Sequence, residues 1–240
     1  MSAHRVDVAV FSLALAVFGL VALALVWSGD WAYALLARAT GNTEAIIVVE
    51  VFPDGSFGRM RVELKQLLEW HHGWAAYVTG VGGDPPRAVG PARLGNKPLF
   101  TPDEYAHMAD VRNVFAGAQL VGLLALAVVA FRLRRAWRER RALRLARDGG
   151  FWAAGVVALA GVGSAFAFDP LFLLFHETFF PQGNFLFDPA TSNLLRLYPE
   201  WYWQGITAGV GLSFIAVAIL VAGAAHIALR RGSNTYTRAA

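Results

Sequence analysis

Four long apolar blocks, separated by polar segments, dominate the pattern of this sequence. They cover about residues 8–27, 111–133, 151–175 and 206–229. A helix rises ~1.5 Å per residue and a bilayer's hydrocarbon core is ~30 Å thick, so each block is long enough to cross a membrane. With 56% hydrophobic residues bunched in this way, the chain is predicted to be an all-α transmembrane protein built on a four-helix membrane bundle. The first block exceeds the apolar region of a signal peptide, so we expect an uncleaved anchor.

The basic residues predict an orientation for these spans. Eight arginines fall between residues 132 and 147, beside the second block. Together with both chain ends, this segment holds twelve arginines against three acidic residues. Because positive loops stay inside, we expect cytoplasmic termini and a cytoplasmic loop over 132–149. Segments 30–100 and 176–204 then lie outside. Arginines beside a span favour membrane lipids as partners and not nucleic acid.

The first outer segment, 30–100, is long enough to fold into a small mixed α/β cap between spans 1 and 2. Residues 45–52 are rich in β-branched side chains and stop at a turn sequence, 53–56. Residues 57–62 are the expected returning strand of a hairpin. Residues 63–77 have helical apolar spacing, and the glycines and prolines of 80–98 predict a loop.

Two histidines are predicted to reach the same depth from different helices. Thr101 to Glu104 reads as a capping box with proline at the first helical position, so a helix should run from there through His107 into the second span. His107 then lies seven residues before Val114, where the uninterrupted apolar run begins, or ~10 Å above it. A helix that begins at the start of the third block has risen ~30 Å by about Leu171, which is the thickness of the hydrocarbon core. We therefore expect His176 to lie at the outer interface as well.

Ionisable residues at the mouth of a membrane helix are functional candidates. Asp110 is placed to orient His107, although both could simply be polar residues in the headgroup zone. Glu177 stands next to His176 among phenylalanines, where an interfacial anchor is the alternative. Asp169 precedes a proline and either supports the site or ends the span.

Further residues complete the candidate set. We expect Arg196, Asn184 and Phe180 to contact substrate, Arg196 through a lipid phosphate or glycerol oxygen. The aromatic-rich stretch around Arg196 predicts an amphipathic re-entry segment on the outer leaflet. His71 and His72 are expected to be a solvated pair, since adjacent helical residues face different ways.

The chemistry that these residues favour is general acid–base catalysis. The chain has no cysteine and no Gly-x-Ser-x-Gly motif, so a covalent acyl-enzyme is poorly supported. A histidine pair without a protein nucleophile points to a nucleophile supplied by substrate or water. We expect no cofactor and no resident metal. Zinc held by both histidines with Asp110 and Glu177 is a weaker alternative.

Two segments resemble those of a known family. Leu99–Phe115 (LFTPDEYAHMADVRNVF) and Phe168–Trp203, which contains FHETFF and LYPEWYW, are similar to signature segments of the lipoprotein intramolecular transacylase (Lit) family of four-span bacterial membrane proteins. The resemblance implies a lipoprotein substrate with a diacylglyceryl cysteine, whose sn-2 acyl chain moves to the free α-amine. It implies that His107 and His176 are the catalytic pair and that the site faces the outer leaflet of the cell membrane.

The sequence also departs from the family, and other functions stay open. Phe185 stands where tryptophan is expected, and Asn193 near an expected acid. One rival is a lipid hydrolase or remodelling enzyme that uses the same histidines on water. The other is a non-catalytic lipid-binding or assembly protein, for which the histidines would be dispensable.

Overall fold

The computed structural model describes residues 3–50, 57–90 and 96–237. The chain divides into two compact units. The first combines Met1–Ala24, Ala118–Ala167 and Ala208–Ala240, and the second combines Leu25–Gly117 and Phe168–Thr207. Both candidate histidines belong to the second unit.

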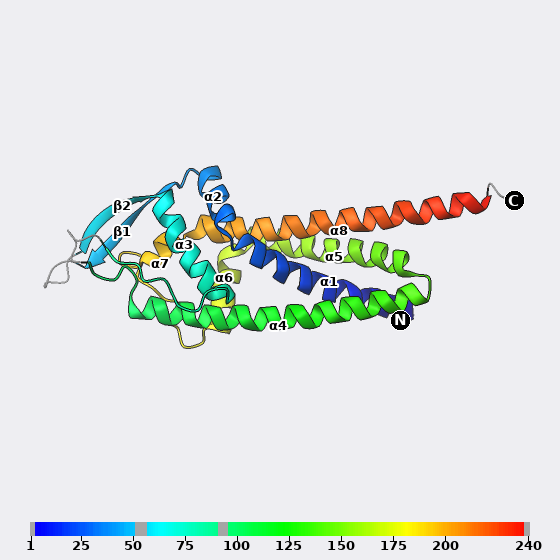
Figure 1. Cartoon of the computed structure of the whole chain (residues 1–240), viewed down its shortest axis with the longest axis horizontal. Coiled ribbons are helices and arrows are strands. Elements are labelled where there is room, and N and C mark those ends of the chain that lie inside the picture. Colours follow the sequence, from blue (N-terminus) through cyan, green and yellow to red (C-terminus); the bar gives the residue numbers. More distant parts are fainter. Residues whose placement is uncertain (1–2, 51–56, 91–95, 238–240) are drawn as a thin grey trace. The chain divides into compact units, whose positions relative to one another are not determined.

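The first unit is a helical bundle. It is built from α1 (Ala3–Trp27), α5 (Ala142–Phe166) and the parts within it of α4 (Pro102–Arg138) and α8 (Glu200–Thr237), all coiled ribbons in Figure 1. Each of these four helices is long and apolar enough to cross a membrane. Large apolar side chains such as Leu159 and Leu220 are 75% and 71% exposed, as expected for helices that face lipid. The predicted four-helix transmembrane fold is therefore confirmed.

Small residues let the helices of this bundle approach closely. A Cβ at Gly149 would come within 2.3 Å of the Phe11 ring, so glycine is needed where α5 crosses α1. At one end of the bundle Asp7 is buried and pairs with Arg132 and Arg141. These two pairs tie the start of α1 to the arginine-rich segment, which places both at the same end.

The second unit contains the predicted mixed α/β cap. Strands β1 (Glu44–Glu50) and β2 (Phe57–Glu63) pair antiparallel, with Glu44 opposite Glu63, and α3 (Leu64–Thr79) packs on both strands. The hairpin and its following helix are thus confirmed, whereas the expected turn over 53–56, like part of the 80–98 loop, lies outside the described residues. The structure adds a helix that we did not predict, α2 (Asp30–Ala39), which packs on α3.

The re-entry segment joins the core of the second unit. The short helix α7 (Asn193–Leu197) contacts β1, and Leu194 and Leu197 are buried. The Asn193 amide nitrogen donates to the carbonyls of Val48 and Leu99, at 2.7 and 2.6 Å. Our expectation of an amphipathic segment lying on the membrane surface is corrected here, because the apolar side of the helix packs on protein.

The third apolar block is not one continuous helix. Helix α5 ends at Phe166, Ala167 is non-helical, and α6 (Phe168–Phe179) begins at once. Pro170 lies in the first turn of α6, where its missing N–H costs no helical hydrogen bond. The helix break therefore lies two to three residues before Asp169 and Pro170, and α6 belongs to the second unit.

Candidate active site

The rings of His107 and His176 lie together in the second unit. His107 is on α4 and His176 is on α6. Their ring centroids are 6.1 Å apart and their planes are within 14° of parallel. No hydrogen bond between the two rings is present in the described part of the chain. The structure thus brings together the two histidines that depth counting placed at one level.

His176 has a defined hydrogen-bonding partner. Its Nδ1 lies 2.7 Å from the carbonyl oxygen of Phe172, one turn earlier on α6. A carbonyl only accepts, so Nδ1 must carry the proton, and the lone pair of the neutral ring sits on Nε2. Burial lowers the pKa of His176 below its usual value, and the Phe172 bond opposes part of that shift.

His107 is the more enclosed ring, with 7% of its surface exposed. Its Nδ1 is buried and has no hydrogen-bond partner among the described residues. The side chain of Asn184 lies beside the ring and interacts with it. A buried polar atom without a partner is costly, and such atoms concentrate where a protein later meets a ligand.

Asp110 makes its hydrogen bonds to two amides, and none to His107 in the described part of the chain. Its Oδ2 accepts from Asn184 Nδ2 at 2.6 Å and from Gln182 Nε2 at 2.8 Å. These bonds orient the Asn184 amide, so that its oxygen, which also accepts from Gln182 at 3.1 Å, is the atom free to accept from an imidazole N–H. We expected a direct contact between Asp110 and the imidazole, and the structure instead interposes Asn184.

Phenylalanines enclose the two imidazoles. Phe180 is 1% exposed and contacts both rings, with its centroid 4.7 Å from that of His107 and 5.5 Å from that of His176. Phe172 and Phe185 lie against His176 at 4.2 and 5.1 Å, and Phe187 lies 5.5 Å from His107. These apolar neighbours lower the local polarity around both imidazoles, which strengthens electrostatic interactions there.

A buried carboxylate fixes the start of the helix that carries His107. Glu104 Oε2 accepts from the Thr101 N–H at 2.8 Å, and the Thr101 hydroxyl accepts from the Glu104 N–H at 3.2 Å, which confirms the capping box. The other oxygen, Oε1, accepts from the Ser192 hydroxyl at 2.6 Å and from the Leu194 N–H at 2.7 Å. This second role, joining α4 to α7, was not predicted, and burial of a capping glutamate has no sequence signal of its own.

Three other predicted residues lie differently. Asp169 and Glu177 are exposed, and the described residues show no hydrogen bond from either one to a histidine. Arg196 donates to the Ala190 carbonyl at 2.8 Å and lines a separate cavity of about 270 Å³ with Tyr33 and Trp201. Neither histidine of the pair lines that cavity.

We predicted that His71 and His72 of α3 are both solvated, and this prediction is wrong for His71. His71 is 1% exposed and its Nδ1 lies 3.2 Å from the hydroxyl of Tyr198, whereas His72 is exposed and contacts Asp30 at 2.9 Å. Burial lowers the pKa of His71 to about 4. Adjacent residues face different ways, as predicted, and the α3 face that carries His71 is the core face.

The weaker alternative of a zinc site gains no geometric basis. In the residues that the structure describes, no group of three or more histidine and carboxylate side chains is placed to hold a metal ion. Asp110 is occupied by the two amides, and Glu177 is exposed.

Comparisons with known proteins agree with the resemblance seen in the sequence. Residues 90–203 match the family model of the lipoprotein intramolecular transacylase Lit. No curated protein matches the chain. Among solved structures, Lit from Bacillus cereus is 17% identical, covers 98% of both chains and superposes with a TM-score of 0.65. Two variants of that protein also match, and each match covers 94% of the variant's chain. The variant with a histidine replaced by arginine is 15% identical, with a TM-score of 0.67 over 96% of this chain. The variant with a histidine replaced by alanine is 16% identical, with a TM-score of 0.66 over 95% of this chain. The shared fold is that of a membrane-integral protein.

Proposed function

We propose, on the premise that this chain belongs to the lipoprotein intramolecular transacylase family, that it moves the sn-2 acyl chain of a diacylglyceryl lipoprotein from oxygen to nitrogen. The acceptor is the α-amine of the N-terminal cysteine, and the product is an N-acylated lyso-lipoprotein. The observation that carries this proposal is the pair of facing imidazoles, His107 and His176, packed among phenylalanine rings.

His176 is the better candidate for the initial base. Its Nε2 holds the lone pair, because Nδ1 donates to Phe172. A free α-amine has a pKa of about 7.7–8.0, so at neutral pH it is largely protonated and needs a base to release its lone pair. The lowered pKa of His176 keeps this imidazole neutral at pH 7, so that the Nε2 lone pair is unprotonated.

His107 is suited to the charge that develops on oxygen. In the proposed step the ammonium first loses one proton to solvent by way of His176. The amine nitrogen then bonds to the ester carbonyl carbon, and the second proton lost from nitrogen goes to an imidazole. The bond from carbon to the sn-2 oxygen then breaks, and that oxygen takes a proton from the pair. With the other ring nitrogen held toward the Asn184 amide oxygen, Nδ1 of His107, which has no partner among the described residues, would carry the N–H that stabilises the oxyanion or delivers the proton once the ring takes up a proton. No covalent acyl-enzyme is needed, because the nucleophile belongs to the substrate.

In the proposed reaction the enzyme can act largely by positioning two groups of one substrate molecule. Amine and ester are parts of one molecule, so holding them in near-attack geometry removes much of the barrier. The capping box and the Glu104 contacts fix α4 three residues before His107. A site at the outer interface of the cell membrane, with cytoplasmic termini, would meet a substrate anchored in that leaflet, and we propose that orientation from the arginine bias.

Product identity tests this proposal. Purified protein would be reconstituted with a diacylglyceryl lipopeptide that carries a ¹³C-labelled sn-2 chain, and the peptide and released lipids would be analysed by mass spectrometry. We expect the label on the cysteine nitrogen of a lyso product. Labelled free fatty acid would instead indicate a hydrolase that activates water. Absence of any turnover, with intact lipopeptide binding, would indicate a non-catalytic lipid-binding protein.

A further inference from the structure

A cavity of about 610 Å³ lies in the first unit, among residues of α1 and α5. The two helices touch beneath it, where the Ser12 hydroxyl donates to the Val8 carbonyl and lies 3.1 Å from the Gly149 carbonyl. Because this hydroxyl is satisfied by backbone oxygens, the floor presents no free polar group to an apolar guest. The lining comprises His4, Arg5, Val8, Ala9, Ser12, Leu13, Ala16, Asp148, Trp152, Ala153 and Val156.

The cavity is a groove one leaflet long. On α1 its lining runs from His4 to Ala16, and twelve residue steps at ~1.5 Å each give ~18 Å, a little more than half of a ~30 Å hydrocarbon core. Small residues, Ala9 and Ala153, make the hollow, and larger apolar side chains flank it, with Val156 54% exposed. An acyl chain of one leaflet matches both this length and this chemistry.

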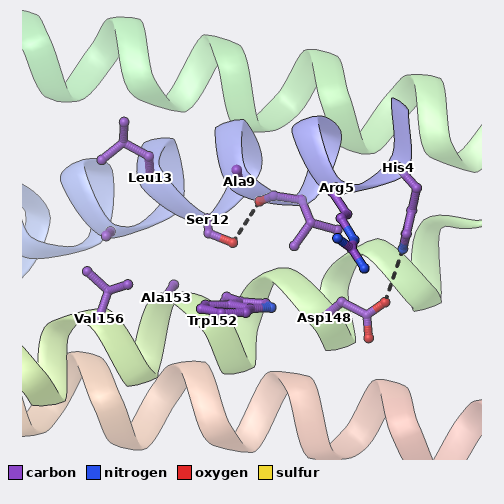
Figure 2. Close-up of a pocket in the computed structure, with 11 residues that line it drawn as sticks. His4, Arg5, Ala9, Ser12, Leu13, Asp148, Trp152, Ala153 and Val156 are labelled. Atoms are coloured by element: carbon purple, nitrogen blue, oxygen red, sulfur yellow. Dashed lines mark hydrogen bonds and ion pairs between the residues drawn. The ribbon is translucent and has the colours of Figure 1, made fainter. Parts of the chain in front are cut away.

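One end of the groove is charged. His4 lies 3.5 Å from Asp148, which also pairs with Arg147 at 2.7 Å. Figure 2 shows the Arg5 side chain reaching from α1 into the space toward α5, at the same end as His4 and Asp148. In the described part of the chain Arg5 has no ion pair, because Asp148 is already engaged by its two partners.

Two further features indicate that this end of the groove lies at the level of the lipid headgroups. The indole ring of Trp152, 66% exposed, lies along the groove with its nitrogen directed to the charged end (Figure 2), as tryptophan does at membrane interfaces. The same end carries the arginine-rich segment, since Asp7 on α1 pairs with Arg132 and Arg141. The local charge is therefore strongly positive, which favours an anionic headgroup.

We propose that this groove binds one glycerophospholipid with an anionic headgroup. One acyl chain lies between α1 and α5 over Ala9 and Ala153, and the phosphate contacts the Arg5 guanidinium. The charges favour a lipid such as phosphatidylglycerol over one whose headgroup adds a positive charge beside Arg5 and His4. The site is separate from the proposed acyl-transfer chemistry, since neither His107 nor His176 lines it.

Lipid titration of the full-length protein in detergent, followed by native mass spectrometry, tests the site. Wild type is compared with three variants using phosphatidylglycerol and phosphatidylcholine. Arg5→Gln should weaken phosphatidylglycerol binding by about fivefold and remove its preference over phosphatidylcholine, since one basic residue near the headgroup is worth ~1 kcal/mol. Ala9→Phe, which fills the hollow from an exposed position, should weaken both lipids by about tenfold or more.

The control is Arg134→Gln, which removes an exposed arginine from the arginine-rich segment without touching the groove. It should leave both affinities within twofold of wild type, and thermal unfolding should confirm that all variants stay folded. Equal wild-type binding of the two lipids would overturn the headgroup assignment. Unchanged binding by Ala9→Phe, or equal losses in Arg134→Gln and Arg5→Gln, would overturn the groove.

Discussion

The Nδ1 of His176 and the carbonyl oxygen of Phe172 are 2.7 Å apart, within one turn of α6. This single contact decides which nitrogen of the ring can act as a base. Because the helix itself supplies the acceptor, the orientation of His176 depends on the local backbone and not on a distant loop. Nε2 is left as the lone-pair nitrogen that the proposed reaction requires.

The first prediction concerns the protonation of His176. In ¹⁵N spectra of histidine-labelled protein at neutral pH, the His176 signal should show protonated Nδ1 and unprotonated Nε2. Its titration midpoint should lie below 6.5, because burial disfavours the imidazolium, so the ring takes up its second proton only in more acidic solution. The spectrum of His176→Gln assigns the signal. A midpoint above 6.5, or an Nε2–H tautomer, would remove His176 as the base.

The second prediction concerns Asp110 as a positioning residue. Asp110→Ala removes the carboxylate that accepts from Asn184 and Gln182. Hydrogen bonds to a charged group contribute about 1.5–3 kcal/mol, so a disturbed Asn184 should lower kcat by about tenfold or more while KM changes little. Asp110→Glu should restore part of the rate.

The matched control for this position is Asp103→Ala, an exposed carboxylate on the same helix. Its kcat should stay within twofold of wild type. If Asp110→Ala raised KM alone and left kcat intact, the amide relay to His107 would not contribute to the chemical step.

The third prediction concerns the buried carboxylate of Glu104. It accepts hydrogen bonds from Thr101, Ser192 and Leu194, and Glu104→Ala leaves their three donors unsatisfied in a buried site. We expect a loss of about 3 kcal/mol in unfolding free energy, seen as a lower thermal midpoint. Glu104→Gln should lose less, since the amide keeps one acceptor oxygen. Ser192→Ala should lose about 1 kcal/mol, and an equal loss in all three variants would contradict this ranking.

The fourth prediction concerns pH and the stability of the second unit. The pKa of His71 is lowered from 6.5 to about 4 by burial. Between these values the unfolded chain binds a proton that the folded chain refuses, so stability falls as pH drops from about 6.5 to 4, by up to ~3 kcal/mol. Thermal midpoints measured from pH 7 to pH 4.5 should fall less steeply for His71→Gln than for wild type.

His72→Gln supplies the matched control, because the neighbouring ring is exposed. Its midpoints should keep most of the wild-type pH dependence. If His71→Gln showed the same slope as wild type, a buried neutral His71 would not be a source of acid sensitivity.

Features that depend on local periodicity were predictable from the sequence. The apolar blocks, the hairpin, α3 and the capping box at Thr101 follow from residue spacing and turn chemistry, and the structure has all of them. The shared level of His107 and His176 also followed, since helical rise converts residue counts into depth. Within the second unit the two rings lie 6.1 Å apart, and their depth in a membrane stays a prediction.

Features that depend on long-range packing were not predictable in the same way. His71 and His72 have the same side chain and adjacent positions, and only the packing of α3 against Tyr198 decides which one is buried. Likewise, Asn184 lies 74 positions after Asp110 in the sequence. This spacing does not predict that the two side chains hydrogen-bond to each other beside His107. That contact depends on the path of segment 180–192. Its backbone is irregular, so the sequence has no repeating hydrophobic pattern from which the path could be predicted.

The rate of N-acylation in a purified system tests the central claim most directly. A diacylglyceryl lipopeptide would be incubated with reconstituted wild type, His107→Ala and His176→Ala, each shown to be folded by its thermal midpoint, and the N-acylated lyso product would be quantified by mass spectrometry. General acid–base catalysis contributes about 10²–10⁴-fold, so each variant should lose at least about 100-fold in kcat. Wild-type rates in either folded variant would contradict the account of a histidine pair that catalyses acyl transfer.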